Sequence, residues 1–261
     1  MPNGKPKIAV FKFASCDGCQ LSLLDLEDEL LALCGEVEFA YFLEARTYHE
    51  PGPYDIALVE GSITTQHDIE RIHQVRQDTK YLVTIGACAT TGGIQALRNW
   101  KDVSEFTRAV YATPAYIEIL ATSSSISSHV AVDFELNGCP INRYQFLEVL
   151  TALLLGRAPQ LAAHAVCVEC KRAGTTCVLV SHGTACMGPL THAGCGAICP
   201  SYNRGCYGCF GPMESPNAEA LVAHLRSTGV PAPALQRLLR GFTGYAEIFR
   251  SASDKLERGE L

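Results

Sequence analysis

Cysteine residues are the strongest chemical signal in this 261-residue chain, which has thirteen of them. The N-terminus has charges but no apolar export core, so we expect the chain to stay in a reducing compartment. Thiols there remain free unless a metal binds them, and metal coordination is therefore the leading explanation. Inert buried cysteines are the alternative, but they do not account for three separate pairs with two-residue spacing: Cys16 and Cys19, Cys167 and Cys170, Cys206 and Cys209.

Four cysteines of the first half each follow a predicted strand. Cys16 and Cys19 follow the first strand, and Cys88 and Cys139 follow two later ones. Ligands gather beyond the carboxyl ends of the strands in an open parallel sheet, so we expect these thiols at one edge. By count, four thiolates suit a cubane iron–sulfur cluster or a structural zinc ion equally well. Structural zinc usually draws on two close pairs, whereas one pair joined by two distant cysteines favours an iron–sulfur cluster.

Two carboxylates and a glycine-rich loop accompany these cysteines. Asp17 lies between the paired thiols and Glu60 ends a predicted strand. Each is either an ordinary carboxylate or a group that tunes the cluster or passes protons. The loop at 86–93 lacks the Lys-Ser or Lys-Thr of a phosphate loop, and no G-x-G-x-x-G follows the first strand. Its glycines are better explained by a backbone that approaches a bulky cluster.

Alternating strands and helices must position these residues. Apolar runs predict strands at residues 7–13, 37–43, 55–60, 81–85 and 130–136. Amphipathic patterns predict helices at residues 20–33, 66–77 and 143–155. Such alternation implies a parallel sheet covered on both faces. The predicted fold class is therefore α/β, a flavodoxin-like parallel sheet domain followed by a small irregular iron–sulfur cluster domain.

The pattern changes after Pro159, because residues 167–209 hold eight cysteines among many glycines and prolines. A segment with so little apolar surface cannot fold alone, so bound metal must supply much of its stability. Helical patterns return in the tail, where we expect short surface helices available to a partner. The predicted organisation is a flavodoxin-like domain with one cluster at 1–158, a two-cluster domain at 159–214 and a helical C-terminal tail at 215–261.

Charge and hydropathy exclude two classes of partner. The formal charge of −6 and the absence of a basic stripe argue against a nucleic acid, because binding to phosphates depends on clustered Lys and Arg. The longest apolar run, at residues 149–155, is far too short to span a bilayer. We therefore expect a cytoplasmic chain with no nucleic-acid partner and no membrane anchor.

Six motifs in order resemble the small subunit of nickel–iron hydrogenases, particularly the soluble cytosolic group that includes sulfhydrogenase delta subunits. The likeness covers about residues 7–212. Its most specific parts are Cys-Asp-Gly-Cys at 16–19, Val-Glu-Gly-Ser at 59–62, Gly-Ala-Cys at 86–88, Gly-Cys-Pro at 138–140, Cys-Met-Gly-Pro-Leu-Thr at 186–191 and Cys-Tyr-Gly-Cys at 206–209.

The resemblance implies three [4Fe–4S] clusters, each with four cysteine ligands. The proximal set is Cys16, Cys19, Cys88 and Cys139; the medial set is Cys195, Cys199, Cys206 and Cys209; the distal set is Cys167, Cys170, Cys177 and Cys186. Membrane-linked relatives place a His where Cys167 stands and a Pro where this chain has Cys199. His164, His182 and His192 are then unnecessary as ligands. Cys34 is left over, and we expect it to be a buried helix thiol.

The resemblance also implies an electron-transfer subunit with no catalytic residue of its own. A nickel–iron hydrogenase large subunit would split or make hydrogen, and flavin- and iron–sulfur-containing diaphorase-type subunits would take the electrons toward NAD or NADP. A ferredoxin or a sulfur compound stays open as the terminal acceptor. One alternative is a complex I-type cluster subunit, which holds a single cluster, so the eight later cysteines count against it. The other is a zinc-stabilised scaffold protein.

Overall fold

A parallel five-stranded sheet organises the first half of the chain in the computed structural model, which describes residues 4–261. The strands are β1 (Lys7–Lys12), β2 (Glu38–Phe42), β3 (Tyr54–Glu60), β4 (Thr79–Ile85) and β5 (Phe134–Leu136). Their order, β2-β1-β3-β4-β5, is the flavodoxin-like one, so the predicted fold class is confirmed. The strand expected at 130–136 is the exception, since only its last three residues pair with β4.

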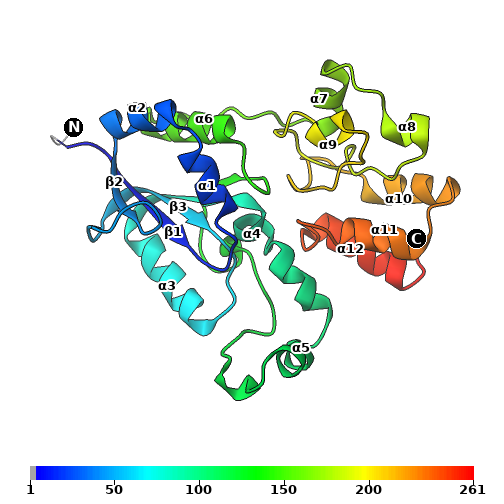
Figure 1. Cartoon of the computed structure of the whole chain (residues 1–261), viewed down its shortest axis with the longest axis horizontal. Coiled ribbons are helices and arrows are strands. Elements are labelled where there is room, and N and C mark those ends of the chain that lie inside the picture. Colours follow the sequence, from blue (N-terminus) through cyan, green and yellow to red (C-terminus); the bar gives the residue numbers. More distant parts are fainter. Residues whose placement is uncertain (1–3) are drawn as a thin grey trace.

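Helices cover both faces of the sheet (Figure 1). Alternate residues of β1 point to opposite faces, as the twofold period of a strand requires. Ile8 and Val10 enter a core with α1 (Gly18–Leu24) and α6 (Arg143–Leu154). Ala9 and Phe11 enter a second core with α3 (Gln66–Gln77). α3 matches its predicted bounds, and a reciprocal capping box between Thr65 and Asp68 fixes its start.

The single helix predicted at 20–33 is wrong, because the chain breaks it into α1 and α2 (Asp28–Glu36). Leu26 is buried in the first core, and the next residue, Glu27, takes a φ of 52° that a helix does not allow. The prediction of a buried Cys34 is also wrong. This thiol is exposed, because α2 has no buried residue.

Short helices that the periodicity did not predict lie between β4 and β5. They are α4 (Gly86–Thr91), the 3₁₀ helix η1 (Ile94–Trp100), α5 (Val103–Val110), and the 3₁₀ turns η2 (Pro114–Tyr116) and η3 (Ile126–Ser128). α4 begins directly where β4 ends and carries Cys88. The carboxyl edge of the sheet is therefore capped by helix rather than by an open loop.

The cysteine-rich segment contains only three short helices, α7 (Val166–Arg172), α8 (Val178–His182) and α9 (Ile198–Ser201). Its buried cluster is small and includes two of its own cysteines, Cys186 and Cys206, with Val166, Val178 and Ala197. The dependence of this segment on bound metal for its stability stays a prediction.

The C-terminal tail is helical, as its patterns predict, and forms α10 (Ala218–Ser227), α11 (Ala232–Leu239) and α12 (Glu247–Glu257). They are not the surface helices we expected. Leu221, Leu239 and Phe249 pack into one core with Met187 and Leu190 of the cysteine-rich segment. The apolar stripes of the tail are thus satisfied within the chain, and Figure 1 shows the three helices gathered beneath α8 and α9.

The described residues contain no helix that is long and apolar enough to cross a membrane.

Candidate cluster-binding sites

The first four predicted ligands lie together at the carboxyl edge of the sheet. The backbone N–H of Ala87 donates to the Gly138 carbonyl at 2.7 Å, which joins the loops of Cys88 and Cys139. Burial raises the pKa of the Cys139 thiol to about 11, and the neighbouring Cys88 and Cys16 add to the shift. Burial also raises the pKa of Cys19, with Cys139 and Cys88 again among its neighbours. These mutual effects place the four thiols around one space.

Two glycines leave that space free beside the sulfur atoms. Gly86 has a φ of 86°, and a Cβ there would overlap Sγ of Cys19. Gly93 has a φ of 64°, and a Cβ there would lie 2.6 Å from Sγ of Cys88. Both positions therefore favour glycine for its backbone conformation and for the room it leaves. The residues present fit a bulky thiolate-bound cofactor.

Glu60 and Asp17, the two carboxylates singled out from the sequence, occupy different environments. Glu60 is only 2% exposed and accepts the backbone N–H of Cys19 at 3.1 Å and Nε2 of Gln20 at 2.8 Å. Burial raises its pKa. Asp17 is half-buried and accepts Nζ of Lys12 at 2.6 Å. Glu60 therefore holds the start of α1 in place, while Asp17 belongs to an ion pair at the surface.

The second quartet surrounds the Cys206-Tyr207-Gly208-Cys209 turn. Burial raises the pKa of Cys206 and of Cys209 to about 12 each. Cys209 has Cys206, Cys195 and Cys199 among its neighbours, so the structure brings together all four cysteines of the predicted medial set. The Cys206 thiol donates to the Thr191 hydroxyl at 3.5 Å, and its sulfur accepts the backbone N–H of Gly208, which opposes the rise in its pKa.

The third quartet lies around α7 and the start of α8. Burial raises the pKa of Cys167 to about 11, with further contributions from Cys186, Cys170 and Cys177. A Cβ at Gly188 would lie 3.3 Å from Sγ of both Cys167 and Cys186, so glycine again keeps this space open. Cys177 is exposed, whereas Cys186 is buried.

Neighbouring thiols of different quartets indicate the order of the quartets. Cys139 of the first quartet is among the neighbours of Cys209 in the second. Cys186 of the third quartet accepts the backbone N–H of Cys206 in the second at 3.1 Å. The Cys195-to-Cys209 quartet therefore lies between the other two, and the three spaces form a series from the sheet to the exposed Cys177.

Glu169 is a residue of this region that the sequence reasoning missed. Its Oε1 accepts the backbone N–H of Gly194 at 2.9 Å, and its Oε2 is buried with no hydrogen-bond partner among the described residues. Burial raises the pKa of Cys195, and the negative charge of Glu169 adds to the rise. The only sequence signal was its place between Cys167 and Cys170, which resembles that of Asp17 in the first pair.

The histidines near the quartets hydrogen-bond to backbone or face solvent. Nδ1 of His192 lies 2.7 Å from the Ala193 carbonyl, Nδ1 of His164 lies 3.2 Å from the Ala165 carbonyl, and His182 is exposed at the end of α8. Within residues 4–261, no three His, Cys, Asp or Glu side chains approach closely enough to hold a single metal ion.

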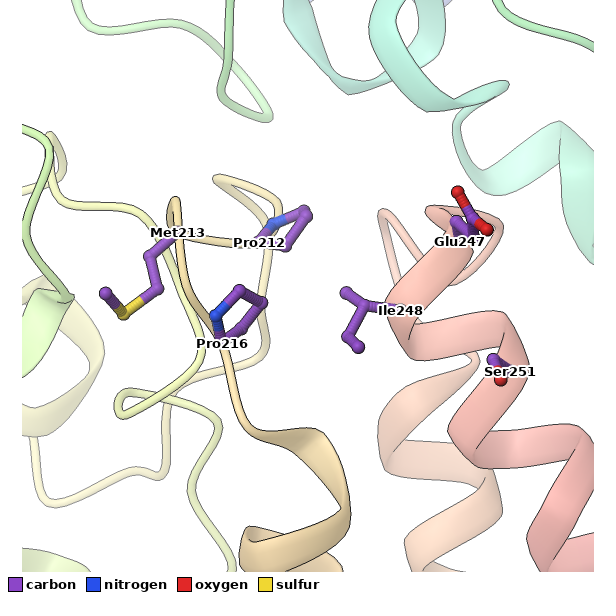
Figure 2. Close-up of a pocket in the computed structure, with 6 residues that line it drawn as sticks. All are labelled: Pro212, Met213, Pro216, Glu247, Ile248 and Ser251. Atoms are coloured by element: carbon purple, nitrogen blue, oxygen red, sulfur yellow. The ribbon is translucent and has the colours of Figure 1, made fainter.

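An open cavity of about 400 Å³ lies away from the cysteines (Figure 2). Pro212, Met213 and Pro216 form one wall, and Glu247, Ile248 and Ser251 of α12 form the other. No cysteine lines this cavity, so it plays no part in the series of thiol quartets.

The fold and these thiols define a cysteine-rich α/β electron-transfer protein of the iron–sulfur type. The family model for the NADH ubiquinone oxidoreductase 20 Kd subunit matches residues 16–153, just over half of the chain, and the chain belongs to this family. The matched residues end before Cys167, so this match covers the sheet domain and not the eight later cysteines.

Hydrogenase subunits are similar to a larger part of the chain. The sulfhydrogenase 2 subunit delta of Pyrococcus furiosus is 36% identical, over 90% of this chain and 98% of its own length. A subunit of the F420-non-reducing hydrogenase vhu of Methanocaldococcus jannaschii is 31% identical, over 91% of this chain and 94% of its own. The resemblance to nickel–iron hydrogenase small subunits is therefore confirmed.

A solved hydrogenase structure has a similar fold. One chain of an NAD⁺-reducing [NiFe]-hydrogenase, in the H₂-reduced state, superposes with a TM-score of 0.57 at 32% identity. The match covers 96% of that chain but 60% of this one, so about two fifths of this chain has no counterpart there.

Proposed function

We propose that this chain carries three [4Fe–4S] clusters and conducts electrons between the hydrogen-activating site of a large subunit and an acceptor subunit. The series of three thiol quartets is the observation that supports it most directly. Three cubane clusters need twelve cysteines, and Cys34 alone is left of the thirteen. No thiolate set remains for a nickel–iron centre, so hydrogen activation belongs to the partner.

The clusters, when bound, supply one-electron chemistry, and the chain itself supplies ligands, hydrogen bonds and shielding from water. Cys16, Cys19, Cys88 and Cys139 would hold the proximal cluster, the Cys195-to-Cys209 quartet the medial one, and the Cys167-to-Cys186 quartet the distal one. Cys206 and Cys186 are 4% and 7% exposed, so burial keeps water from these sulfur atoms. Backbone N–H groups of Gly188 and Cys206 reach the Cys186 sulfur, and such contacts tune a cluster's potential.

The large subunit would dock beside Cys88, on an apolar patch that we define by Ile94, Leu97, Phe106 and Val110. These side chains are 56%, 39%, 44% and 72% exposed and line an open cavity on η1 and α5. Gln95, in the same cavity, lies 3.5 Å from Sγ of Cys88 through its Oε1. The patch is therefore continuous with the proximal site, as an electron path from a large subunit requires.

The acceptor side would be a flavin- and iron–sulfur-containing diaphorase-type subunit that passes electrons to NAD or NADP. The similarity to the NAD⁺-reducing hydrogenase structure supports this acceptor. The two clusters that lie beyond the sheet domain would extend the electron path toward it. The localisation that fits such a complex is the cytoplasm.

Replacement of the exposed distal ligand tests the direction of flow. Cys177→Ser should stop electron delivery to the acceptor while hydrogen–deuterium exchange at the large subunit continues, because exchange needs no external acceptor. The matched control is Cys34→Ser, which should leave both activities at the parental level. Loss of both activities in an intact Cys177→Ser complex would contradict the proposed order of the clusters.

A further inference from the structure

The surface around Cys177 differs in charge from the rest of the chain. Residues 171–213 contain three of the 21 Lys and Arg residues and none of the 27 Asp and Glu residues. This segment therefore has a formal charge of +3 in a chain whose total is −6. Since a net charge of one sign attracts partners of the opposite sign, the segment can select its partner by charge.

The basic side chains lie on the helix that precedes Cys177 and on the turn that follows α9. Lys171 and Arg172 form the last turn of α7, and Cys177 is the residue that precedes α8. Arg204 is exposed on the turn that follows α9. Figure 1 shows α7 and α8 at the end of the molecule remote from the sheet.

Exposed apolar side chains lie among these charges. Val180 on α8 is 82% exposed and Tyr202 after α9 is 75% exposed. The hydroxyls of Thr175 and Ser201 are 3.5 Å apart, which places α9 beside the loop that leads to Cys177. Apolar groups at the centre with charges at the rim are the usual composition of a protein interface.

We propose that this surface, the exit face, is the docking site of the acceptor subunit, and that the acceptor presents Asp and Glu side chains to it. The exit face is defined by Lys171, Arg172, Val180, Tyr202 and Arg204. The inference depends on the proposed function, because it places the acceptor on the surface beside the distal quartet. Charge complementarity identifies the occupant, because an acidic subunit is attracted and a basic one is repelled.

Carbodiimide cross-linking of the purified native complex tests the contact. This reagent joins an amine directly to a carboxylate with no spacer, and Lys171 is the only lysine between residues 171 and 213. Mass spectrometry should find Lys171 joined to Asp or Glu of the acceptor subunit. Lys171→Arg, which keeps the charge and removes the amine, should lose this link and keep electron delivery.

Charge reversal tests the energetic role of the same residues. The Lys171→Glu/Arg172→Glu complex should release the acceptor subunit at a several-fold lower salt concentration than the parent, because screening and repulsion act together. The control Lys80→Glu/Arg237→Glu changes two exposed cations elsewhere by the same charge and should behave like the parent. A Lys171 residue that is unlinked or linked to the large subunit, or a control as salt-sensitive as the exit-face variant, would overturn the inference.

Reduction of a viologen dye with hydrogen distinguishes a wrong docking site from a wrong proposed function. The dye collects electrons without a docking protein. An active complex whose acceptor docks elsewhere would reject the exit face alone, whereas a complex with no hydrogen-dependent activity would reject the proposed function.

Discussion

Nε1 of Trp100 donates a hydrogen bond of 2.8 Å to Oδ1 of Asp254, a residue 154 positions further along the chain. The Arg240 guanidinium lies 4.5 Å from the centroid of the Trp100 ring and 3.1 Å from Asp254. Trp100 ends η1, the helix that carries Gln95 beside Cys88, whereas Asp254 belongs to α12. We call this contact of Trp100, Arg240 and Asp254 the latch, and it fixes the C-terminal helices to the sheet domain.

The C-terminal tail also contacts the medial site. Thr243, between α11 and α12, donates its hydroxyl to the Gly208 carbonyl at 2.7 Å, and Gly208 lies between Cys206 and Cys209. The tail therefore contacts the medial quartet and the sheet domain at once. Its structural role is to hold the proximal and medial sites in a fixed relation.

Trp100→Ala should loosen the tail, because it removes both the ring under Arg240 and the donor to Asp254. A hydrogen bond to a charged group contributes about 1.5–3 kcal/mol, so the melting temperature of the anaerobic complex should fall measurably. Trp100→Phe keeps a ring and should lose less. Tyr116→Ala removes an aromatic side chain that is 85% exposed and serves as the control. A tail as resistant to limited proteolysis in Trp100→Ala as in the parent would show that the latch is not structural.

Phe106→Asp should weaken binding of the large subunit, because it puts a charge into the apolar patch beside Cys88. Desolvation of an unpaired carboxylate costs several kcal/mol, so co-purification of the large subunit should fall at least tenfold. Val180→Asp makes the same change on the exit face and should leave the large subunit bound. Equal losses in both variants would point to misfolding rather than to a docking surface.

Glu169→Gln should raise the midpoint potential of the medial cluster. The amide keeps an acceptor for the Gly194 N–H but removes the negative charge beside Cys195. Coulomb's law at an effective dielectric of about 20 gives a shift on the order of 50–100 mV for a unit charge about 7–14 Å from the cluster. Potentiometric electron paramagnetic resonance measures it, with Glu214→Gln at an exposed position as the control. An unchanged medial potential would mean that solvent or a counter-ion already neutralises Glu169.

Periodicity predicted the sheet domain well because its strands and helices bury regular apolar faces. α3 and α6 agree with their predicted bounds to within a residue. The segment from Gly86 to Val110 was not predicted, because α4 and η1 are short and α5 turns its apolar residues, such as Phe106 and Val110, to the surface rather than into a core. The prediction that the tail helices lie on the surface was wrong for a different reason. The apolar stripes of its helices could be recognised in the sequence. Met187 and Leu190, which pack against them, lie in a segment rich in cysteine and glycine, and such a composition does not predict a contribution to a core.

Thiol groupings were the most predictable part of the site, because strand order predicts the first set and the family resemblance implies the other two. Each predicted set of four cysteines is brought together. Glu169 could not be found in this way, since its contact with Gly194 depends on how two loops fold against each other.

Cys199→Pro should convert the medial cluster into a three-iron cluster. Three thiolates would remain from Cys195, Cys206 and Cys209, and proline offers no ligand for the fourth iron. Low-temperature electron paramagnetic resonance of the oxidised complex should show a three-iron signal in the variant. Cys34→Ser is the matched control and should show none. A stoichiometric three-iron signal in the parent would mean that Cys199 is not a ligand.

Metal content of the chain tests the three-cluster account most directly. The chain should be separated anaerobically from its partner subunits, because their own iron would enter the count and oxygen destroys clusters. Three thiolate-bound cubanes predict about twelve irons per chain, about as many acid-labile sulfides, and negligible zinc. Iron near four per chain, or zinc in stoichiometric amount, would contradict the account.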